Sequence, residues 1–383
     1  MICFEGETVF TLIIPVLQTK EILQLFIDSL CQTIQFSTDV IFINDGSPSD
    51  TKQILERCSN ERNTCINSVT ILYHRHSEGC AKCINEALQI MPDCSYAVFM
   101  DSDLILTDSW QAYILDAFKE KKVGIVGGVL LYPQTGGIQC CGITFNQSVG
   151  RHLFLNNTPR VLDSKKPFII QSTVFAFCAV RVSAIKQVGL LDENFFNGYE
   201  DFDYQFRIRE KGYIAVTNPN IILYHWETSC GPHRTFNRKS NLGRFWEKHS
   251  FFVNPDLLDY LLPQLEKIKD KKYLLVDLCE GRTEAKQIID ILIREDKIIE
   301  YMDYSYFSSD GSIWIPKVLG SNYYLRTDSI IFLCDHFIKL TDNMYWWNIR
   351  SQTQKDDLIL DLYANLIRFD DLQKTFWPGN KIR

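Results

Sequence analysis

The feature that most constrains the fold is an alternation of strand and helix patterns through the first hundred residues. Short apolar runs rich in β-branched residues predict strands, and segments with apolar residues every three or four positions predict helices. The expected strands are 8–16, 39–45, 69–75 and 96–103, and the expected helices are 20–34 and 80–90. Strands that alternate with helices are typical of right-handed βαβ units, so this region predicts an α/β fold with a mostly parallel central sheet.

A further helix is expected directly after the second strand, because the residues there fit a helix N-terminus. Ser47 can act as the N-cap, Pro48 suits the first helical position, and Asp50 can accept a hydrogen bond from the backbone nitrogen of the cap. Polar residues also cluster at the C-terminal ends of the strands. Ligands bind at that edge of an open α/β sheet, so the sequence predicts a ligand site there.

The middle of the chain continues with strand patterns and two shorter helices. Residues 123–145 are glycine-rich and strand-like, residues 168–180 form one apolar run expected as a strand, and residues 221–225 are expected as another. Helices are expected at 183–188 and at 200–211, and the second has acids in its first turn.

A domain boundary is expected near Ser250. Asn254 and Pro255 fit the start of a helix just beyond it. The α/β pattern then begins again, with a strand at 273–278, a helix at 283–295 and a strand at 297–305. We therefore expect one domain at residues 1–250 and a smaller C-terminal α/β accessory region at residues 251–383, with a role in acceptor binding, partner binding or structure.

The composition is that of an ordinary globular protein and argues against several partners. The chain has 383 residues, is 46% hydrophobic and carries a formal net charge of −7, so nucleic acid is not expected as a partner. The apolar run 168–180 is shorter than the roughly 20 residues of a membrane-spanning helix, and the N-terminus lacks signal-peptide features. We expect a cytoplasmic protein with no transmembrane segment that is able to contact the inner face of the membrane peripherally.

The cysteines are interpreted as structural thiols. The chain has thirteen, but they do not form the dense, evenly spaced framework of a small secreted domain. Cys80 and Cys83 make one CxxC pair. A zinc site usually needs a second pair or histidines at set spacing, and neither follows this pair along the chain.

Two polar segments at strand ends are candidates for ligand binding. The segment Asn44–Ser47 can bond to a nucleobase or ribose while Gly46 lets the backbone turn; a plain turn with a helix cap is the alternative. In the segment Asp101–Asp103, two carboxylates separated by one residue can both reach Mg²⁺ or Mn²⁺, which prefer oxygen ligands and bridge phosphates. An acidic surface loop is the alternative for this segment.

Two later segments carry further candidates for catalysis. Glu200 and Asp201 open an expected helix, where acids often act only on the helix dipole, although a carboxylate held there can also act as a general base. His225 closes an expected strand and can bind a metal through its neutral imidazole. A buried histidine with only structural hydrogen bonds is the alternative.

The order of these segments resembles the family 2 glycosyltransferases. The matching stretches, between about residues 8 and 250, are LIIPV, NDGSPSD, SEGCAKCINEAL, MDSD, VGIVGGVLLYPQTGGIQCCG, LLDENFFNGYEDFDYQFRIREKGY and LYHWE. This resemblance implies the GT-A fold, a nucleotide-binding α/β sandwich that holds its donor at the C-terminal edge of the sheet.

The resemblance also implies roles in metal binding and catalysis. Asp101 and Asp103 match the DxD motif of the family, with Asp103 as the direct metal ligand and Asp101 nearer the ribose. His225 matches a histidine that completes the metal site in some members. Asp201 matches the base that activates the acceptor, and Glu200 its neighbour that binds acceptor hydroxyls.

The donor is expected to contact a set of residues along the sheet edge, with Asp45 at the base. Ser77 stands where many relatives have asparagine, so that contact is not carried over. The expected donor-binding residues are Pro15, Val16, Asn44, Asp45, Ser47, Arg75, Gly79, Lys82, Asp101 and Ser102.

The function implied is inverting transfer of a sugar from a nucleotide diphosphate sugar to an acceptor hydroxyl, with Mn²⁺ or Mg²⁺ as cofactor. UDP is the nucleotide most used in the family, and dTDP is the alternative; the acceptor is a glycan, a lipid-linked oligosaccharide or a protein. A nucleotidyltransferase is disfavoured, because residues 14–23 contain no glycine for a triphosphate-binding loop. A catalytically inactive protein that binds nucleotide sugars or serves as a scaffold is the remaining alternative.

Overall fold

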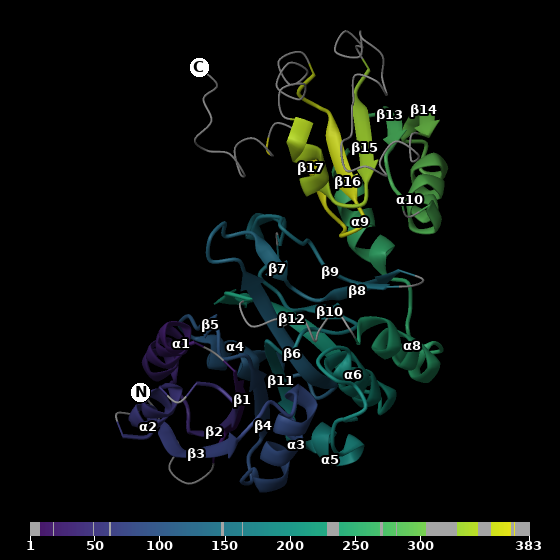
Figure 1. The fold of residues 1–383 in the computed structure, drawn as a ribbon. Coiled ribbons are helices and arrows are strands. Elements are labelled where there is room, and N and C mark those ends of the chain that lie inside the picture. The colour runs from purple at the N-terminus through teal and green to yellow at the C-terminus, as the bar shows by residue number, and fades with distance from the viewer. Residues whose placement is uncertain are drawn as a thin grey trace, which may run out of the picture. The chain divides into compact units, whose positions relative to one another are not determined.

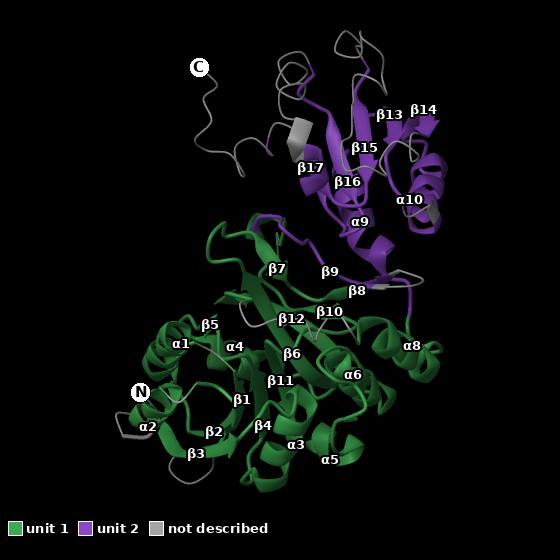
Figure 2. Cartoon of the chain, in the orientation of Figure 1, with its two compact units in different colours: residues 1–143, 159–253 green, residues 144–158, 254–383 purple. Residues whose placement is uncertain are grey.

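The chain forms two compact units in a computed structural model. One unit comprises residues 1–143 and 159–253, and the other comprises residues 144–158 and 254–383 (Figure 2). The structure describes residues 8–17, 19–48, 50–60, 63–146, 149–162, 164–227, 237–268, 271–280, 282–303, 328–343, 354–368 and 371.

The first unit is built on a mixed sheet that has ten strands within the described residues (Figure 1). The strands are β1 (Phe10–Val16), β2 (Thr38–Asp45), β3 (Ile66–His74), β4 (Tyr96–Met100), β5 (Leu104–Ile105), β6 (Val123–Leu131), β7 (Ile138–Cys140), β10 (Phe168–Ile170), β11 (Phe177–Arg181) and β12 (Ile214–His225). The main path runs β10-β12-β6-β11-β4-β1-β2-β3, with β5 beside β12 and β7 beside β6. The β4-β1-β2-β3 and β6-β12 pairings are parallel, which confirms the predicted α/β fold with a mostly parallel sheet.

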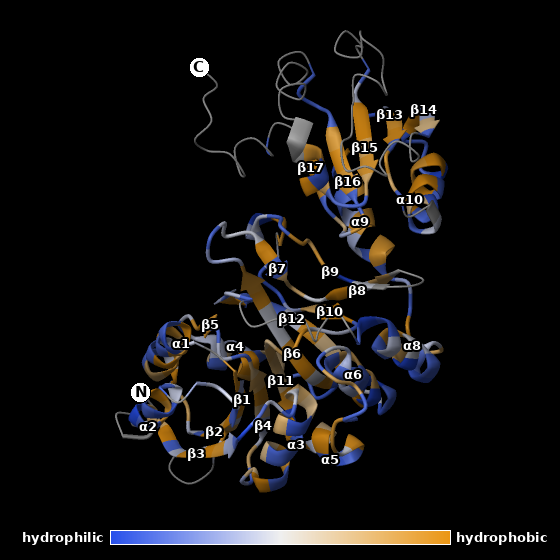
Figure 3. Ribbon diagram, in the orientation of Figure 1, coloured by the Kyte–Doolittle hydropathy of each residue, from blue (hydrophilic) through white to orange (hydrophobic). Residues whose placement is uncertain are grey.

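Helices cover both faces of this sheet (Figure 1). They are α1 (Lys20–Thr33), α2 (Thr51–Asn60), α3 (Cys80–Ile90), α4 (Trp110–Ala117), α5 (Val182–Val188), α6 (Glu200–Glu210) and α8 (Arg238–His249), with a short 3₁₀ turn at Pro159–Val161. Apolar residues of α3, α5 and α6 share one buried cluster with Ile41 and Ile43 of β2. On the other face, Trp110 of α4 packs against Phe10 and Phe177. Alternate strand residues thus supply two cores, and Figure 3 shows the strands as mostly hydrophobic.

The prediction of a helix beginning at Ser47 is wrong, because α2 begins at Thr51. The Ser47 hydroxyl donates to the carbonyl oxygen of Val16 (2.9 Å) and so does not cap a helix. Instead, the carbonyl oxygen of Pro48 accepts from both the backbone nitrogen and the hydroxyl of Thr51.

The apolar run 168–180, predicted as one strand, is divided into β10 and β11. Its polar centre leaves the sheet and bonds to α6. The backbone nitrogen of Thr173 donates to Gln205 Oε1 (2.9 Å), and Gln205 Nε2 donates to the Thr173 carbonyl (2.6 Å). These two bonds give hydrogen-bond partners to the buried backbone nitrogen and carbonyl of Thr173.

The second unit has its own sheet, in the order β14-β13-β15-β16-β17, parallel except for β17. Its described elements are β13 (Tyr273–Asp277), β14 (Ile298–Asp303), β15 (Ile330–Cys334), β16 (Leu358–Asp361), β17 (Leu366–Arg368), α9 (Leu257–Leu265), α10 (Arg282–Arg294) and 3₁₀ turns at Glu266–Ile268 and Phe337–Asn343. Helix α9 begins at Leu257, later than the predicted start at Asn254 and Pro255. Asp256 accepts bonds there from the Thr144 hydroxyl (2.9 Å) and the Phe145 backbone nitrogen (2.8 Å).

Residues 144–158 pack with the second unit although they lie far from it in sequence (Figure 2). They include most of β8 (Ile143–Asn146) and all of β9 (Val149–His152), which pair with each other. Asn157 Nδ2 donates to Asn365 Oδ1 (2.9 Å), and the Phe154 nitrogen donates to the carbonyl of Tyr363 (2.8 Å). No helix in the part of the chain that the structure describes is long and apolar enough to cross a bilayer.

Candidate active site

The backbone register brings His225 to the acidic segment after β4, although about 120 residues separate them in sequence. Strand β5 follows this segment and pairs antiparallel with the end of β12, so that His225 lies opposite Leu104. The backbone nitrogen of Trp226 donates to the carbonyl of Asp103 (3.2 Å), which extends the same pairing. The edge where β4 and β12 end therefore gathers both segments.

Asp101, Asp103 and His225 form one compact group of potential metal ligands. His225 Nε2 lies 3.0 Å from Asp103 Oδ1 and 3.5 Å from Asp101 Oδ2. One ligand atom from each residue lies within 4.8 Å of the other two. The Asp103 side chain is 2% exposed and the Asp101 side chain 43% exposed, so the group opens to solvent on the Asp101 side. Two carboxylates and an imidazole nitrogen fit Mn²⁺ or Mg²⁺.

Gln139 of β7 fixes the orientation of the His225 ring. Its Oε1 bonds to His225 Nδ1, and its Nε2 donates to Glu227 Oε2 (3.2 Å). The other ring nitrogen therefore faces the carboxylates. Burial alone would lower the pKa of His225, but hydrogen bonds and charges from Asp101 and Asp103 outweigh it and raise the pKa to about 10. A cation bound here would replace the proton on Nε2.

We expect Gln139→Leu to weaken Mn²⁺ binding about 10- to 100-fold, because second-layer partners that orient a ligating histidine typically have effects of this size. Calorimetric titration of the full chain with Mn²⁺ measures the change. Gln187→Leu is the matched control, since Gln187 lies on α5 and bonds to Tyr213 at an exposed site. Equal Mn²⁺ affinity in the two variants would show that Gln139 does not orient a metal ligand.

A second acidic pair begins helix α6 after a tightly held turn. Tyr199 adopts a left-handed conformation (φ 69°), and the Gly198 nitrogen donates to Glu200 Oε2. Asn241 Nδ2 donates to the carbonyl of Gly198 (2.8 Å). Glu200 is buried, whereas Asp201 is half-buried and its Oδ1 accepts from the backbone nitrogen of Phe202 (2.9 Å).

The carboxylates of this pair and of Asp101 all act on the thiol of Cys80. Burial raises the pKa of Cys80 well above its usual value, and the charges of Glu200, Asp101 and Asp201 raise it further. The carboxylate of Asp201 also raises the pKa of buried Cys178 on β11, the neighbour of β4. Asp101, Glu200 and Asp201 thus all lie close enough to Cys80 to act on its ionisation.

The ends of β1 and β2 are tied together by the Asn44–Ser47 segment. Asn44 Oδ1 accepts from the backbone nitrogen of Ser47 (2.9 Å), and the Ser47 hydroxyl bonds to Val16 as described above. Gly46 (φ 86°) passes so close to the loop after β3 that a Cβ atom would lie 3.0 Å from the backbone nitrogen of Ser77. This contact and the positive φ together favour glycine at position 46.

The Asp45 carboxylate holds the loop between β3 and α3. Its Oδ2 accepts from the Ser77 hydroxyl (2.6 Å) and the Gly79 nitrogen (3.2 Å), and its Oδ1 accepts from the Glu78 nitrogen (2.8 Å). Burial alone would raise the pKa of Asp45, but these bonds and the one from His74 lower it overall. Asp45 is therefore a buried anion that organises this edge of the sheet.

The remaining candidate residues differ in their burial and in the element that carries them. Pro15 is half-buried near the end of β1, opposite Ile43, and Ser102 is buried between the two aspartates. Arg75 is exposed in the loop after β3. Lys82 is half-buried on α3 and pairs with Glu78 one turn earlier.

Comparison with known proteins is consistent with this architecture. Residues 11–189 match the model of the family described as Glycosyl transferase family 2. This region is similar to the members of glycosyltransferase family 2. The family 2 match includes Asp45, Asp101 and Asp103 but ends before Asp201 and His225, whose assignment therefore rests on the geometry above. No curated protein matches the sequence.

The structure of GalNAc-T7 with UDP, GalNAc and Mn²⁺ is similar to this chain with a TM-score of 0.51 and 14% identity. The match covers 64% of this chain and 48% of GalNAc-T7, and it shows that the fold is GT-A. A Pyrobaculum calidifontis mannosyltransferase with GDP-Man and Mn²⁺ matches with TM-score 0.47 and 15% identity, covering 66% of each chain. S. aureus TarS matches with TM-score 0.43 and 13% identity, over 64% of this chain and 44% of TarS. The chain thus spans less than two thirds of each of these proteins.

Proposed function

We propose that the chain transfers a sugar from a nucleotide diphosphate sugar to an acceptor hydroxyl with inversion at the anomeric carbon, in the assembly of a glycan or glycoconjugate. UDP is the proposed nucleotide, and GDP or dTDP the alternatives. The observation that carries the proposal is the position of Asp101. Its carboxylate lies 3.5 Å from His225 Nε2, and with Asp103 it forms a compact group whose ligand atoms lie within 4.8 Å of one another. The charges of Asp101, Glu200 and Asp201 also act together on the thiol of Cys80. This arrangement supports a site that holds a diphosphate through a metal ion and has carboxylates available to accept a proton.

Asp201 is the proposed general base. It is the less buried carboxylate of the pair at the start of α6, so an acceptor hydroxyl is able to approach it. Deprotonation of that hydroxyl as it attacks the anomeric carbon typically contributes about 10²–10⁴-fold to the rate. Glu200, which is buried and bonded to the preceding turn, is proposed to orient the acceptor.

Asp103, Asp101 and His225 are the proposed ligands of Mn²⁺ or Mg²⁺. A divalent cation bound there supplies charge stabilisation to the departing nucleoside diphosphate. Residues near this cation site are proposed to hold the donor. Asp45 fixes the loop between β3 and α3, and the segment Asn44–Ser47 ties the end of β2 to the end of β1. We assign the transfer chemistry to residues 1–250 and an accessory role to residues 251–383.

We expect Asp103→Ala to abolish most of the Mn²⁺-dependent gain in donor affinity, because the variant removes the most buried ligand of the proposed metal site. Calorimetric titration of UDP into the full chain, with and without Mn²⁺, measures this gain. GDP and dTDP are titrated in parallel. A gain that persists in Asp103→Ala would contradict the metal assignment, whereas Asp116→Ala, at an exposed ion pair on α4, should leave the gain unchanged.

A protein that binds nucleotide sugars without turning them over is the alternative. The discriminating observation is release of nucleoside diphosphate from the donor, which only the transferase produces. Donor binding without any such release, in the presence of Mn²⁺ and an acceptor mixture, would favour the binding protein.

A further inference from the structure

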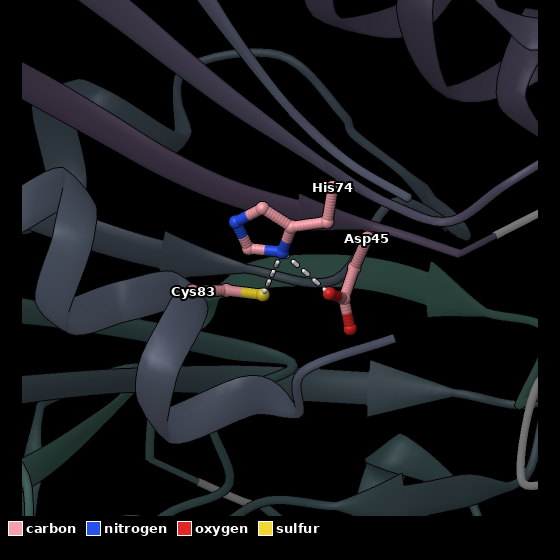
Figure 4. A group of neighbouring side chains, drawn as sticks. All are labelled: Asp45, His74 and Cys83. Atoms are coloured by element: carbon pink, nitrogen blue, oxygen red, sulfur yellow. Dashed lines mark hydrogen bonds and ion pairs between the residues drawn. The ribbon is translucent and has the colours of Figure 1, made fainter. Parts of the chain in front are cut away.

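A second group of possible metal ligands lies at the ends of β2 and β3, apart from the aspartates after β4. It consists of Asp45, His74 and Cys83, with one ligand atom from each within 4.8 Å of the other two. Asp45 and His74 are register partners on parallel strands, so their side chains emerge side by side. Cys83 lies in the second turn of α3, which covers this face of the sheet. Figure 4 shows the three side chains converging, with His74 Nδ1 facing both the Asp45 oxygen and the Cys83 sulfur.

The distances lie close to those of a tetrahedral metal site. His74 Nδ1 is 2.7 Å from Asp45 Oδ1 and 4.0 Å from Cys83 Sγ. Zinc bonds of about 2.0–2.3 Å at tetrahedral angles would separate the nitrogen from the oxygen by about 3.4 Å and from the sulfur by about 3.6 Å. Side-chain shifts of less than about 1 Å would therefore admit the ion, and the fourth position would be filled by water.

The second layer around this group also matches that of a metal site. His74 Nε2 bonds to Glu86 Oε2 (2.7 Å), so the ring carries a carboxylate on the side away from Asp45 and Cys83. Metal-bound histidines usually donate their second nitrogen to such a carboxylate, which fixes the ring and its tautomer. The Asp45 carboxylate is in turn held by Ser77, Glu78 and Gly79, as ligating carboxylates usually are.

The charges of this group are also compatible with a bound metal ion. Both ring nitrogens of His74 face carboxylate oxygens, an arrangement that a doubly protonated imidazolium satisfies. A divalent ion would replace two protons, the one on His74 Nδ1 and the one on the Cys83 thiol. The two positive charges of the ion balance the two that leave with these protons. The net charge of this buried group stays the same. The thiolate favours a borderline ion such as Zn²⁺ over Mg²⁺ or Mn²⁺, which prefer oxygen ligands.

We propose that Asp45, His74 and Cys83 bind a zinc-class ion that ties β2, β3 and α3 together at the sheet edge. This site is separate from the Asp101, Asp103 and His225 group and does not depend on the proposed sugar transfer. The sequence pattern did not reveal it, because the partner of the CxxC cysteine is a histidine nine residues upstream on a different element. Cys80, the first cysteine of the pair, is not part of the group.

Titration of the full, chelator-treated chain with Co²⁺ tests the proposal, because a thiolate bound to cobalt gives an intense near-ultraviolet charge-transfer band that oxygen and imidazole ligands do not give. The titration uses Asp103→Ala as background to remove the other candidate site. We expect the band to saturate at one equivalent, to be lost in Cys83→Ser and to be retained in the matched control Cys80→Ser. Zn²⁺ should displace the cobalt, and Glu86→Gln should weaken binding about 10- to 100-fold.

The absence of a thiolate band in the folded Asp103→Ala chain would overturn the proposal and leave a proton-bridged triad of Asp45, His74 and Glu86. A band that survives Cys83→Ser, or one that is lost in Cys80→Ser, would also overturn it. Circular dichroism verifies folding. If Cys83→Ser does not fold, His74→Gln carries the same test, since it removes the nitrogen ligand and leaves the thiol in place.

Discussion

Replacing Asp201 by asparagine should lower the rate of sugar transfer about 10²–10⁴-fold and leave donor binding intact, because the amide cannot accept the proton of the acceptor hydroxyl. The substitution preserves size, and the amide oxygen can still accept the bond from the Phe202 backbone nitrogen. Initial rates of nucleoside diphosphate release measure transfer with a donor and acceptor that the wild type turns over, and calorimetry measures donor affinity.

Asp116→Asn is the matched control for this experiment. Asp116 lies on α4, is 58% exposed and pairs with nearby Lys119. Its substitution should leave both rate and affinity unchanged. Wild-type turnover by Asp201→Asn would remove Asp201 from the mechanism, and a matching loss of donor affinity would assign it to donor binding instead.

Asp203→Ala should destabilise the first unit by about 3–5 kcal/mol, because it removes the buried anion at the centre of a cluster formed with Arg207, Lys248 and His249. The Asp203 side chain is 0% exposed. Its Oδ1 accepts from Lys248 (2.9 Å) and His249 (3.0 Å), and its Oδ2 accepts from Arg207 (2.9 Å). In a unit of this size the loss corresponds to a fall of roughly 6–20 °C in the midpoint of thermal unfolding.

The pH dependence of that loss gives an independent readout. Burial alone would raise the pKa of Asp203, but bonds from His249 and Lys248 and the charge of Arg207 hold it at about 2. A carboxyl with a depressed folded-state pKa stabilises above its unfolded value, near 3.8, and this contribution is lost as pH falls toward about 2. The difference in the midpoint of thermal unfolding between wild type and Asp203→Ala should therefore have its full size at pH 7 and become smaller below about pH 4.

The comparison variant for stability is Asp116→Ala, whose exposed ion pair should change stability by about 0.5 kcal/mol or less. Thermal unfolding of the three proteins by circular dichroism provides the measurement. Equal midpoints for Asp203→Ala and Asp116→Ala would show that the buried ion cluster contributes no more than a surface pair.

The fold was predictable where local patterns decide the structure. Helix α3 has the predicted bounds, 80–90, because its buried residues recur at helical spacing and Gly79 precedes it. The start of α2 was not predictable from capping preferences alone. Ser47 is a good cap by type, but the nearby end of β1 offers its hydroxyl a carbonyl partner at Val16. Tertiary contacts likewise divide the 168–180 run, since Gln205 binds its polar centre.

The candidate site was partly predictable from the sequence. The aspartates after β4 and His225 were expected to meet, and the pairing of β5 with β12 brings them together. Gln139 and Glu227, which orient His225, carry no sequence signal because polar residues at strand ends are common. His74 was not anticipated either: it is a partner of Asp45 only through the register of β2 and β3.

The central claim is that Asp101, Asp103, His225 and Asp201 form a site for sugar transfer. The most direct test is to incubate the full chain with UDP-, GDP- and dTDP-sugars, Mn²⁺ and an acceptor mixture, and to measure nucleoside diphosphate release. The account predicts metal-dependent release from at least one donor by the wild type, and loss of that release in Asp103→Ala and Asp201→Asn. Stabilisation of the chain by a nucleotide sugar without release of its diphosphate would contradict it.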